Sequence, residues 1–314
     1  MALSAAFDEG HFATGDGHMI WYGQYGKPDG VPLIWLHGGP GSGASMRQLQ
    51  LIDLSRYRVV LSDQRGCGRS LPLGAIAAND TSLLVADIER LRTHLQCERM
   101  VLGGGSWGAA LALAYAARHA ASVSALVLRA PFLATQKEID GFFQPAAGAA
   151  DAGWEEFAGL APPSQRSRLL PWLAERFGAA DAEECARLAR GWRRHEQRRE
   201  GAGMAEATVD DVLVARCRVQ SHYLRHGCFM SGESLLEAAR GLARLPVALL
   251  HGDADMVCPP DNARMLQRSL AGSRLRMVAG AGHDPFHPGM AKALVSALDC
   301  YARHGNFAAW KAHA

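Results

Sequence analysis

The chain has 314 residues, and its 33 Lys and Arg residues nearly balance its 31 Asp and Glu residues, so that the formal net charge is +2. A net charge this small creates no long-range field to attract nucleic acid or a membrane surface, and we expect a small molecule or a short peptide as partner. The length is enough for one large α/β domain with an insertion or for two domains.

The first part of the chain alternates short apolar runs, rich in β-branched residues, with amphipathic helical segments. This alternation is typical of a mostly parallel sheet flanked by helices on both faces. Helical spacing of apolar residues predicts a helix within 79–96, and an Ala-rich stretch predicts another over 107–118. The predicted strands of this part are 19–24, 31–37, 57–63, 99–104 and 123–129.

The pattern changes after Pro131. From there to about residue 244 the chain carries helical stretches rich in Ala, Arg and Glu, and no clear buried strand. We therefore predict a helical cap over 133–244 that is inserted into a core formed by 1–132 and 245–314.

The α/β pattern resumes at residue 245. Strands are predicted over 245–251 and 274–279, with a helix from about Pro260 between them and a final helix after them. Loops at the carboxyl ends of parallel strands converge on one site, so residues just after these strands are candidates for chemistry.

The segment GGGSWG at 103–108 fits the pattern G-x-S-x-G, with Gly104, Ser106 and Gly108 at the fixed positions, between a predicted strand and a predicted helix. In a nucleophile elbow the small residues permit a sharp turn that points a strained serine hydroxyl into the site. An ordinary glycine turn is the alternative, and a phosphate-binding loop is excluded because no Lys-Ser or Lys-Thr follows the glycines. The motif predicts Ser106 as the nucleophile of an α/β-hydrolase fold.

A serine hydroxyl needs a base, and in an α/β hydrolase the acid and the base follow the nucleophile along the chain. Asp255, in HGDAD, and His283, in GAGHDPF, come in that order just after predicted strands. His283 would accept the Ser106 proton and later donate it to the leaving group, while Asp255 would fix the tautomer of the histidine. Asp253 and His287 stand close by and remain alternatives for these two roles.

The segment HGGPGSG at 37–43 follows a predicted strand, and its glycines let the backbone approach a bound carbonyl oxygen closely. We expect an oxyanion hole formed by the amide of Gly39 and the amide of Trp107, the residue after the nucleophile. A purely structural turn is the alternative interpretation of this segment.

Four motifs taken together, HGGPGSG, DQRGCGRS at 63–70, GGSWG at 104–108 and GAGH at 280–283, resemble the proline iminopeptidase family of α/β hydrolases. The resemblance covers most of the core and is weaker across the cap. It implies an enzyme that removes N-terminal proline from peptides, with acidic cap residues that hold the free amino group of the substrate. Together with the hydrogen-bonding capacity of Asp and Arg side chains, the resemblance also implies that Asp63 and Arg65 shape their loop by hydrogen bonding.

In the cap, GWRRHE resembles a tryptophan-then-Glu segment of the family and so implies Glu196 as an amine-binding carboxylate. A solvated helix face is the alternative, because RRHEQRRE is dense in charge. The Glu-Asn-His-Tyr segment of the family matches 220–223 here, which implies Gln220 and Tyr223 as substrate-binding residues and places an amide where the family has an acid. An amide cannot neutralise an ammonium, so affinity for a free amine should fall.

The sequence thus predicts a serine hydrolase that releases N-terminal proline or a similar small residue from peptides or amides through an acyl-Ser106 intermediate, with no metal or organic cofactor. The alternatives are an esterase or amino acid amidase with altered cap specificity, a non-catalytic binding protein, and an enzyme of this fold that only moves protons. Intact Ser106, Asp255 and His283 argue against the binding protein.

Seven cysteines are scattered without a CxxC pair or the spacing of a zinc site. Cys67 and Cys258 flank the motif loops, and we expect both to serve in packing because no histidine is placed to activate them. The first residues lack a basic start and an apolar stretch of signal-peptide length, and about 18 apolar residues never run together. These features predict a cytoplasmic protein with reduced thiols.

Overall fold

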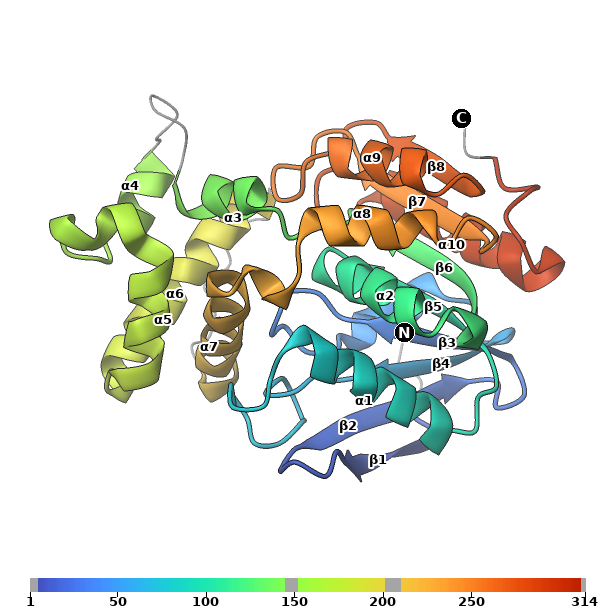
Figure 1. Ribbon diagram of the computed structural model, residues 1–314, viewed down its shortest axis with the longest axis horizontal. Helices are drawn as coiled ribbons and strands as arrows, with labels where there is room; N and C mark the ends of the chain where they lie inside the picture. Colours follow the sequence, from blue (N-terminus) through green and yellow to red (C-terminus); the bar gives the residue numbers. More distant parts are fainter. Residues whose placement is uncertain (1–4, 145–151, 201–209, 312–314) are drawn as a thin grey trace.

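The computed structural model describes residues 5–144, 152–200 and 210–311. Its centre is an eight-stranded sheet in the order β1-β2-β4-β3-β5-β6-β7-β8 (Figure 1). The strands β3 to β8 run parallel to one another, while β2 pairs antiparallel with both β1 and β4. The strands are β1 Asp8–Ala13, β2 Met19–Gly26, β3 Val31–Leu36, β4 Tyr57–Ser62, β5 Met100–Gly105, β6 Val123–Arg129, β7 Val247–Gly252 and β8 Ser273–Val278.

The mostly parallel sheet predicted from the sequence is confirmed, but its first edge strand was missed. β1 has the sequence DEGHFA, and Phe12 is its buried residue. It pairs with β2 in the register Asp8 to Gln24, and Nε2 of Gln24 donates a hydrogen bond of 2.6 Å to the Asp8 carboxylate. An exposed edge strand carries little apolar periodicity, which explains why the pattern did not indicate it.

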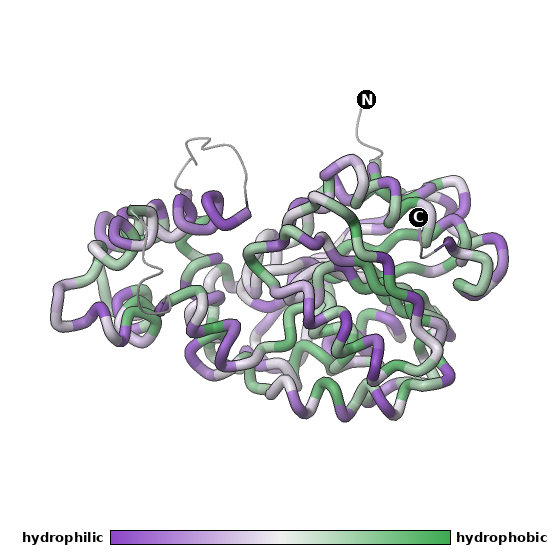
Figure 2. Tube along the Cα trace, turned by 90° about the horizontal axis from the view of Figure 1, so that it is seen from above, coloured by the Kyte–Doolittle hydropathy of each residue, from purple (hydrophilic) through white to green (hydrophobic). Residues whose placement is uncertain are grey.

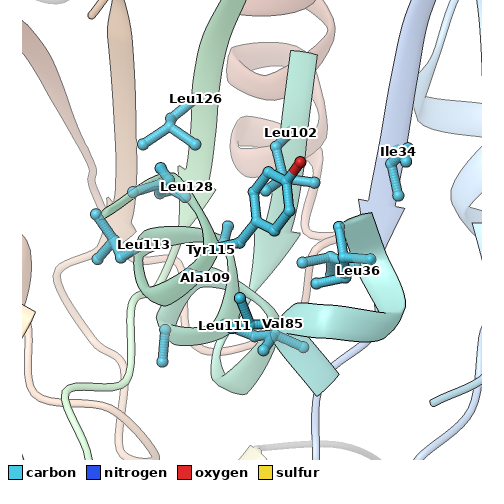
Figure 3. Packing of buried hydrophobic residues seen from close by; sticks show 14 of the residues in the cluster. Ile34, Leu36, Val85, Leu102, Ala109, Leu111, Leu113, Tyr115, Leu126 and Leu128 are labelled. Atoms are coloured by element: carbon cyan, nitrogen blue, oxygen red, sulfur yellow. The ribbon is translucent and has the colours of Figure 1, made fainter. Parts of the chain in front are cut away.

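The strand side chains alternate between two layers of core, as the two-residue period of a strand requires. On β3, Ile34 and Leu36 belong to one hydrophobic cluster, and Leu33 and Trp35 belong to the other. Figure 3 shows part of the first cluster, where side chains of β3, β5 and β6 meet those of two helices. The first layer is covered by the helices α1 Thr81–His94, α2 Trp107–Arg118, α8 Gly232–Arg240 and α9 Asp261–Ser269. The second is covered by α10 Pro288–His304 and the short helix η1 Met46–Leu51.

The helices α3 to α7 stand to one side of the sheet and its flanking helices (Figure 1). Figure 2 shows that hydrophobic residues concentrate in the strands of the sheet. These helices have a hydrophobic core of their own, which includes Phe157, Phe177 and Trp192. They are α3 Gln136–Phe143, α4 Ala152–Ala158, α5 Leu169–Ala179, α6 Ala182–Glu200 and α7 Asp211–Arg225.

The division of the chain at 133 and 244 stays a prediction. Within the predicted cap segment, α8 packs against α2 and α9 and shares the cluster of the sheet through Leu235 and Ala239. Within the described ranges, no helix combines the length and the apolar character that crossing a bilayer requires.

Candidate active site

The turn at Ser106 joins β5 to α2 directly. Ser106 has φ 57° and ψ −122°, a conformation that is uncommon for a residue other than glycine and stores strain. Gly108 makes the turn possible, because a Cβ there would lie 2.3 Å from the carbonyl oxygen of Leu36. The helix therefore begins tightly against the end of β3, and the turn has the geometry of a nucleophile elbow.

Asp255 and His283 meet although they lie on different loops. Nδ1 of His283 lies 2.7 Å from Oδ2 of Asp255. The second carboxylate oxygen, Oδ1, accepts hydrogen bonds from the amides of Val257 and Cys258, at 2.8 and 2.9 Å. Asp255 is 6% exposed, so its orientation is fixed on both oxygens.

The electrostatics of this pair suit a base and its orienting acid. Burial by itself would raise the pKa of Asp255, but hydrogen bonds from His251 and His283 lower it well below the usual value for an aspartate. Burial lowers the pKa of His283, and Asp255 partly opposes that shift. His283 is therefore neutral at neutral pH, with its Nδ1 proton directed at the ionised Asp255 and Nε2 free to accept a proton.

The two alternative residues lie elsewhere. Asp253 is exposed, and its Oδ1 accepts a hydrogen bond of 2.7 Å from the amide of Gly280, which makes it a turn residue. His287 is the residue before α10 and is absent from the described lining of the cavity that holds Ser106 and His283.

The Ser106 hydroxyl points toward a buried cysteine. Oγ of Ser106 lies 3.7 Å from Sγ of Cys258, which is 2% exposed. Burial raises the pKa of Cys258 well above its ordinary value, so the thiol stays protonated. The packing predicted for Cys67 and Cys258 is confirmed by their burial, and Cys258 additionally contacts the proposed nucleophile.

The predicted oxyanion residues flank the elbow. Trp107 is the first residue of α2, so its amide has no acceptor within the helix. Gly39 has φ 115°, which favours glycine, and it lines the cavity. The next glycine toward the N-terminus, Gly38, lies close enough to the elbow that a Cβ on it would be 3.3 Å from the carbonyl oxygen of Gly105.

Gln64 connects the glycine loop to the helix behind the elbow. Its backbone amide donates to Nε2 of His37, and its side-chain amide donates to the carbonyl oxygen of His37, both at 3.0 Å. Its Oε1 accepts a hydrogen bond of 2.8 Å from Nε1 of Trp107. One buried glutamine thus connects His37, two residues before Gly39, to the side chain of Trp107.

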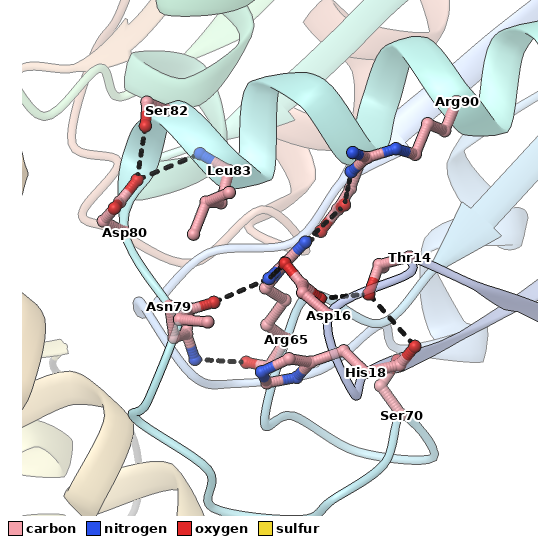
Figure 4. Close-up of polar contacts among 12 residues, drawn as sticks. Thr14, Asp16, His18, Arg65, Ser70, Asn79, Asp80, Ser82, Leu83 and Arg90 are labelled. Atoms are coloured by element: carbon pink, nitrogen blue, oxygen red, sulfur yellow. Dashed lines mark hydrogen bonds and ion pairs between the residues drawn. The ribbon is translucent and has the colours of Figure 1, made fainter.

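A buried arginine fixes the loop that carries Gln64 (Figure 4). Nε and Nη2 of Arg65 donate to the two oxygens of Asp87 on α1, and Nη1 donates to Asp16. The same loop contains Asp63, which accepts hydrogen bonds from the backbone amides of Ala44 and Arg69. The prediction that Asp63 and Arg65 shape this loop by hydrogen bonding is confirmed.

Ser106 and His283 open into a cavity of about 490 Å³ that is also lined by residues of α3, α6 and α7. This volume is within the range of small-molecule sites. Among the described residues, the charged and hydrogen-bonding side chains that line the cavity include Ser106, Arg129, Glu138, Arg193, Glu196, Glu200, Arg216, Gln220 and His283. Its apolar lining includes Phe132, Ile139, Phe142, Phe143 and Leu224.

Glu196 and Gln220 are brought together in this cavity. They are 7% and 6% exposed, and Nε2 of Gln220 donates a hydrogen bond of 3.0 Å to Oε1 of Glu196. The alternative prediction, that Glu196 lies on a solvated helix face, is wrong, because tertiary packing turns this side of α6 inward.

Tyr223 requires a correction. Its side chain is 1% exposed and absent from the described cavity lining, and its hydroxyl donates to Oδ1 of Asn79 at 2.7 Å. Its ring meets Trp107 edge-on, with centroids 5.2 Å apart. Three residues after Gln220, the helix has turned this side chain toward α2, where it packs against Trp107.

Three residues near the site were missed from the sequence. Arg129, the last residue of β6, is 6% exposed and donates from Nη1 to the carbonyl oxygen of His283 at 2.7 Å. Nε2 of His251 lies 3.4 Å from Oδ2 of Asp255. Arg216 pairs with Glu196 at 2.6 Å. Two features of the sequence could have indicated two of them. Arg129 is a charged residue at the end of a predicted strand, and Arg216 lies four residues before Gln220, on the same face of a helix.

Among the described residues, no group of three or more His, Cys, Asp or Glu side chains is arranged to hold a metal ion. All seven cysteines lie in the described ranges, and each is buried and free.

Comparison with known proteins agrees with this geometry. The sequence profile of the alpha/beta hydrolase fold family matches residues 31–289. Proline iminopeptidase of Xanthomonas citri is 37% identical over 304 residues, which cover 94% of this chain and 97% of that protein. Proline iminopeptidase of Arabidopsis thaliana is 37% identical over 300 residues, covering 93% and 79%. Proline iminopeptidase of Neisseria gonorrhoeae is 34% identical over 304 residues, covering 95% and 97%.

Solved structures with this fold are more distant in sequence. An esterase from Rhodococcus sp. ECU1013 superposes with a TM-score of 0.60 at 19% identity, covering 94% of this chain and 98% of that one. An esterase from Thermogutta terrifontis gives 0.59 at 19% identity, covering 95% and 99%. At such identities the likeness establishes the fold alone.

Proposed function

The chain belongs to the proline iminopeptidase family of α/β hydrolases, and from this premise we propose that Ser106, His283 and Asp255 form its catalytic triad. The observation that carries the proposal is the contact of 2.7 Å between Asp255 and His283, because His283 lines the same cavity as the strained Ser106. Its substrate is a peptide or amide with an N-terminal proline or a similar small residue.

Acylation begins when the Ser106 hydroxyl turns from Cys258 toward Nε2 of His283. His283 takes the proton as Oγ attacks the scissile carbonyl carbon, and Asp255 stabilises the imidazolium that forms. The oxyanion accepts hydrogen bonds from the amides of Gly39 and Trp107. Collapse of this intermediate breaks the bond to the leaving amine, which takes its proton from His283 and departs, leaving an acyl-Ser106 ester.

Deacylation repeats these steps with water. His283 removes a proton from the water molecule as its oxygen attacks the acyl-Ser106 ester, and the same two amides stabilise the second oxyanion. The proton then returns from His283 to Oγ of Ser106 as the product acid leaves. Glu196 and Gln220 line the part of the cavity formed by α6 and α7, and we place the N-terminal residue of the substrate against them.

An organophosphonate tests the nucleophile. We expect one equivalent to label Ser106 and to abolish turnover of a proline arylamide, and Ser106→Ala to be neither labelled nor active. Ser122→Ala, in the short turn after α2, is the matched control and should behave as wild type. Normal turnover in Ser106→Ala, or labelling at another residue, would contradict the assignment.

A cytoplasmic location is proposed from the cysteine chemistry. Seven buried thiols, all unpaired, suit a compartment that keeps thiols reduced. Fractionation of cells that express the protein tests this, and its recovery from an oxidising compartment would contradict it.

A further inference from the structure

Two segments of the chain line the cavity on the side from which the leaving group departs. In the proposed mechanism His283 gives its proton to the leaving amine, so the leaving peptide lies on the same side of the scissile bond as this histidine. The residues that follow it, Asp284, Pro285 and Phe286, line the cavity. Residues of the segment 42–48 line it as well. These two segments therefore face the leaving peptide.

Arg47 connects the two segments. Its guanidinium carbon lies 4.1 Å from the centroid of the Phe286 ring, a cation–π contact that holds the charge over the ring. Both residues line the cavity that holds Ser106. A cation–π contact uses none of the hydrogen-bond donors of the guanidinium, so its five N–H groups stay available for a ligand.

The charge of Arg47 is not neutralised by a neighbour. The residue is exposed, and within the described ranges no acidic side chain forms an ion pair with its guanidinium or accepts a hydrogen bond from it. Arg193 and Arg216 line the same cavity toward α6 and α7, and both pair with Glu196. An unpaired positive charge thus lies on the leaving-group side.

Asp284 lies on the same side but is held by its own loop. Its Oδ1 accepts a hydrogen bond of 2.9 Å from the backbone amide of Phe286. A carboxylate has no donor to offer to an anion, and its negative charge repels one. An anionic group of the substrate on this side would therefore be attracted by Arg47 and opposed by Asp284.

A short leaving peptide brings such a group within reach. Phe286 is three residues after His283, so their Cα atoms are at most about 11 Å apart. An extended peptide spans about 3.5 Å per residue, so the C-terminal carboxylate of one to three residues beyond the scissile bond falls within this distance. The paired N–H groups of a guanidinium match the two oxygens of a carboxylate.

We propose that Arg47 binds the C-terminal carboxylate of the leaving peptide, so that the preferred substrates are peptides of two to four residues with an N-terminal proline and a free carboxylate. This inference rests on the proposed function, because it concerns the leaving group of the acyl transfer to Ser106. It makes Arg47 a specificity-determining residue.

The first test compares peptides with a free C-terminus, Pro-Ala, Pro-Ala-Ala and Pro-Ala-Ala-Ala, with their C-terminal amides. Release of proline is measured with the wild-type protein and with Arg47→Gln, and the quantity compared is the ratio of kcat/KM for the free carboxylate to that for the amide. Intrinsic differences between the leaving groups are the same for both proteins. At one or more of the three lengths, this ratio should fall by at least about threefold in Arg47→Gln, mainly through KM.

Arg118→Gln is the matched control. Arg118 is an exposed residue at the end of α2 and is absent from the described lining of the cavity, so this variant removes the same charge from another part of the surface. Its ratio should equal that of the wild type. A fall as large as that in Arg47→Gln would overturn the inference, because the effect would then come from the net charge of the protein.

Asp284→Asn provides a second variant with the opposite sign. Its amide oxygen can still accept from the amide of Phe286, while the loss of the negative charge should raise the ratio by about twofold. For the wild-type protein, the ratio should also fall as sodium chloride is raised from about 0.05 to about 0.5 M, because salt screens an exposed ion pair.

Equal ratios in the wild type and in Arg47→Gln at all three peptide lengths would overturn the inference and leave the proposed function intact. Phosphonate labelling of Ser106 at the wild-type rate shows that Arg47→Gln is folded and that its nucleophile is intact. Failure of the wild-type protein to release proline from any of these peptides, with no labelling of Ser106, would overturn the proposed function itself.

Discussion

Nη1 of Arg129 donates a hydrogen bond of 2.7 Å to the carbonyl oxygen of His283, so a buried guanidinium lies next to the proposed catalytic base. The two residues are 154 positions apart and belong to β6 and to the loop after β8. Burial is the main cause that lowers the pKa of His283, and the charge of Arg129 lowers it further. Asp255 and Glu200 face the histidine with the opposite effect.

Arg129→Gln should shift the pH dependence of the enzyme. Turnover requires neutral His283, so a lowered pKa extends activity to lower pH, and removal of the positive charge should raise the pKa again. We expect the acidic limb of kcat/KM to move to higher pH by roughly 0.5 to 1 unit. The profile is measured with the proline arylamide.

Arg129→Lys is the matched control, since it keeps the charge and alters the hydrogen bond. Its acidic limb should stay at the wild-type position even if kcat falls through looser positioning of His283. Equal shifts in both variants would show that Arg129 acts on the loop and not through its charge.

Asp255→Asn should remove most of the turnover and leave the fold intact. The amide oxygen can still accept from Val257 and Cys258, but its NH₂ group would face Nδ1 of His283 and favour the wrong tautomer. We expect kcat to fall by about 10⁴-fold with little change in the thermal midpoint. Asp253→Asn, in the same loop, should retain wild-type kcat because it only accepts from Gly280. A similar loss in both variants would mean that the loop, and not the acid, had been disturbed.

Arg65→Met should destabilise the protein. Arg65 is fully buried and donates to both oxygens of Asp87, which would keep a buried charge without this partner. We expect the free energy of unfolding in urea to fall by about 3 to 5 kcal/mol. Arg90→Met removes the 44% exposed partner of the same carboxylate and should cost less than about 1 kcal/mol. Equal losses from the two variants would contradict the role assigned to Arg65.

Gly108→Ala should disrupt the elbow. The new methyl group would meet the carbonyl oxygen of Leu36 at 2.3 Å, so α2 or β3 must shift and displace Ser106. We expect loss of phosphonate labelling together with a lower urea midpoint. Gly178→Ala is the control, because a Cβ there has nothing within 4 Å and should stabilise α5 by about 0.5 to 1 kcal/mol. Normal labelling in Gly108→Ala would show that the elbow tolerates a side chain.

The sequence by itself determined the features that depend on near neighbours. The alternation of apolar runs with helical segments predicted the parallel sheet, and the glycines around Ser106 predicted the tight turn, because strand and helix periods and backbone sterics are local. Ser106, Asp255 and His283 could be predicted as candidates because each lies in a short motif directly after a predicted strand. Among the described strands, β1 was not predicted, because this exposed edge strand has no apolar periodicity.

The tertiary structure alone decided which side chains meet across the cavity. Arg129 reaches His283, and Arg216 reaches Glu196, only because separate strands and helices bring these residues to one place. Tyr223 and Gln220 are three residues apart, yet the turn of α7 sends one behind Trp107 and the other into the cavity. Charges and hydrogen bonds act over a few ångströms in space, whatever the separation along the chain, so the partners of Glu196 depend on the packing of α6 against α7.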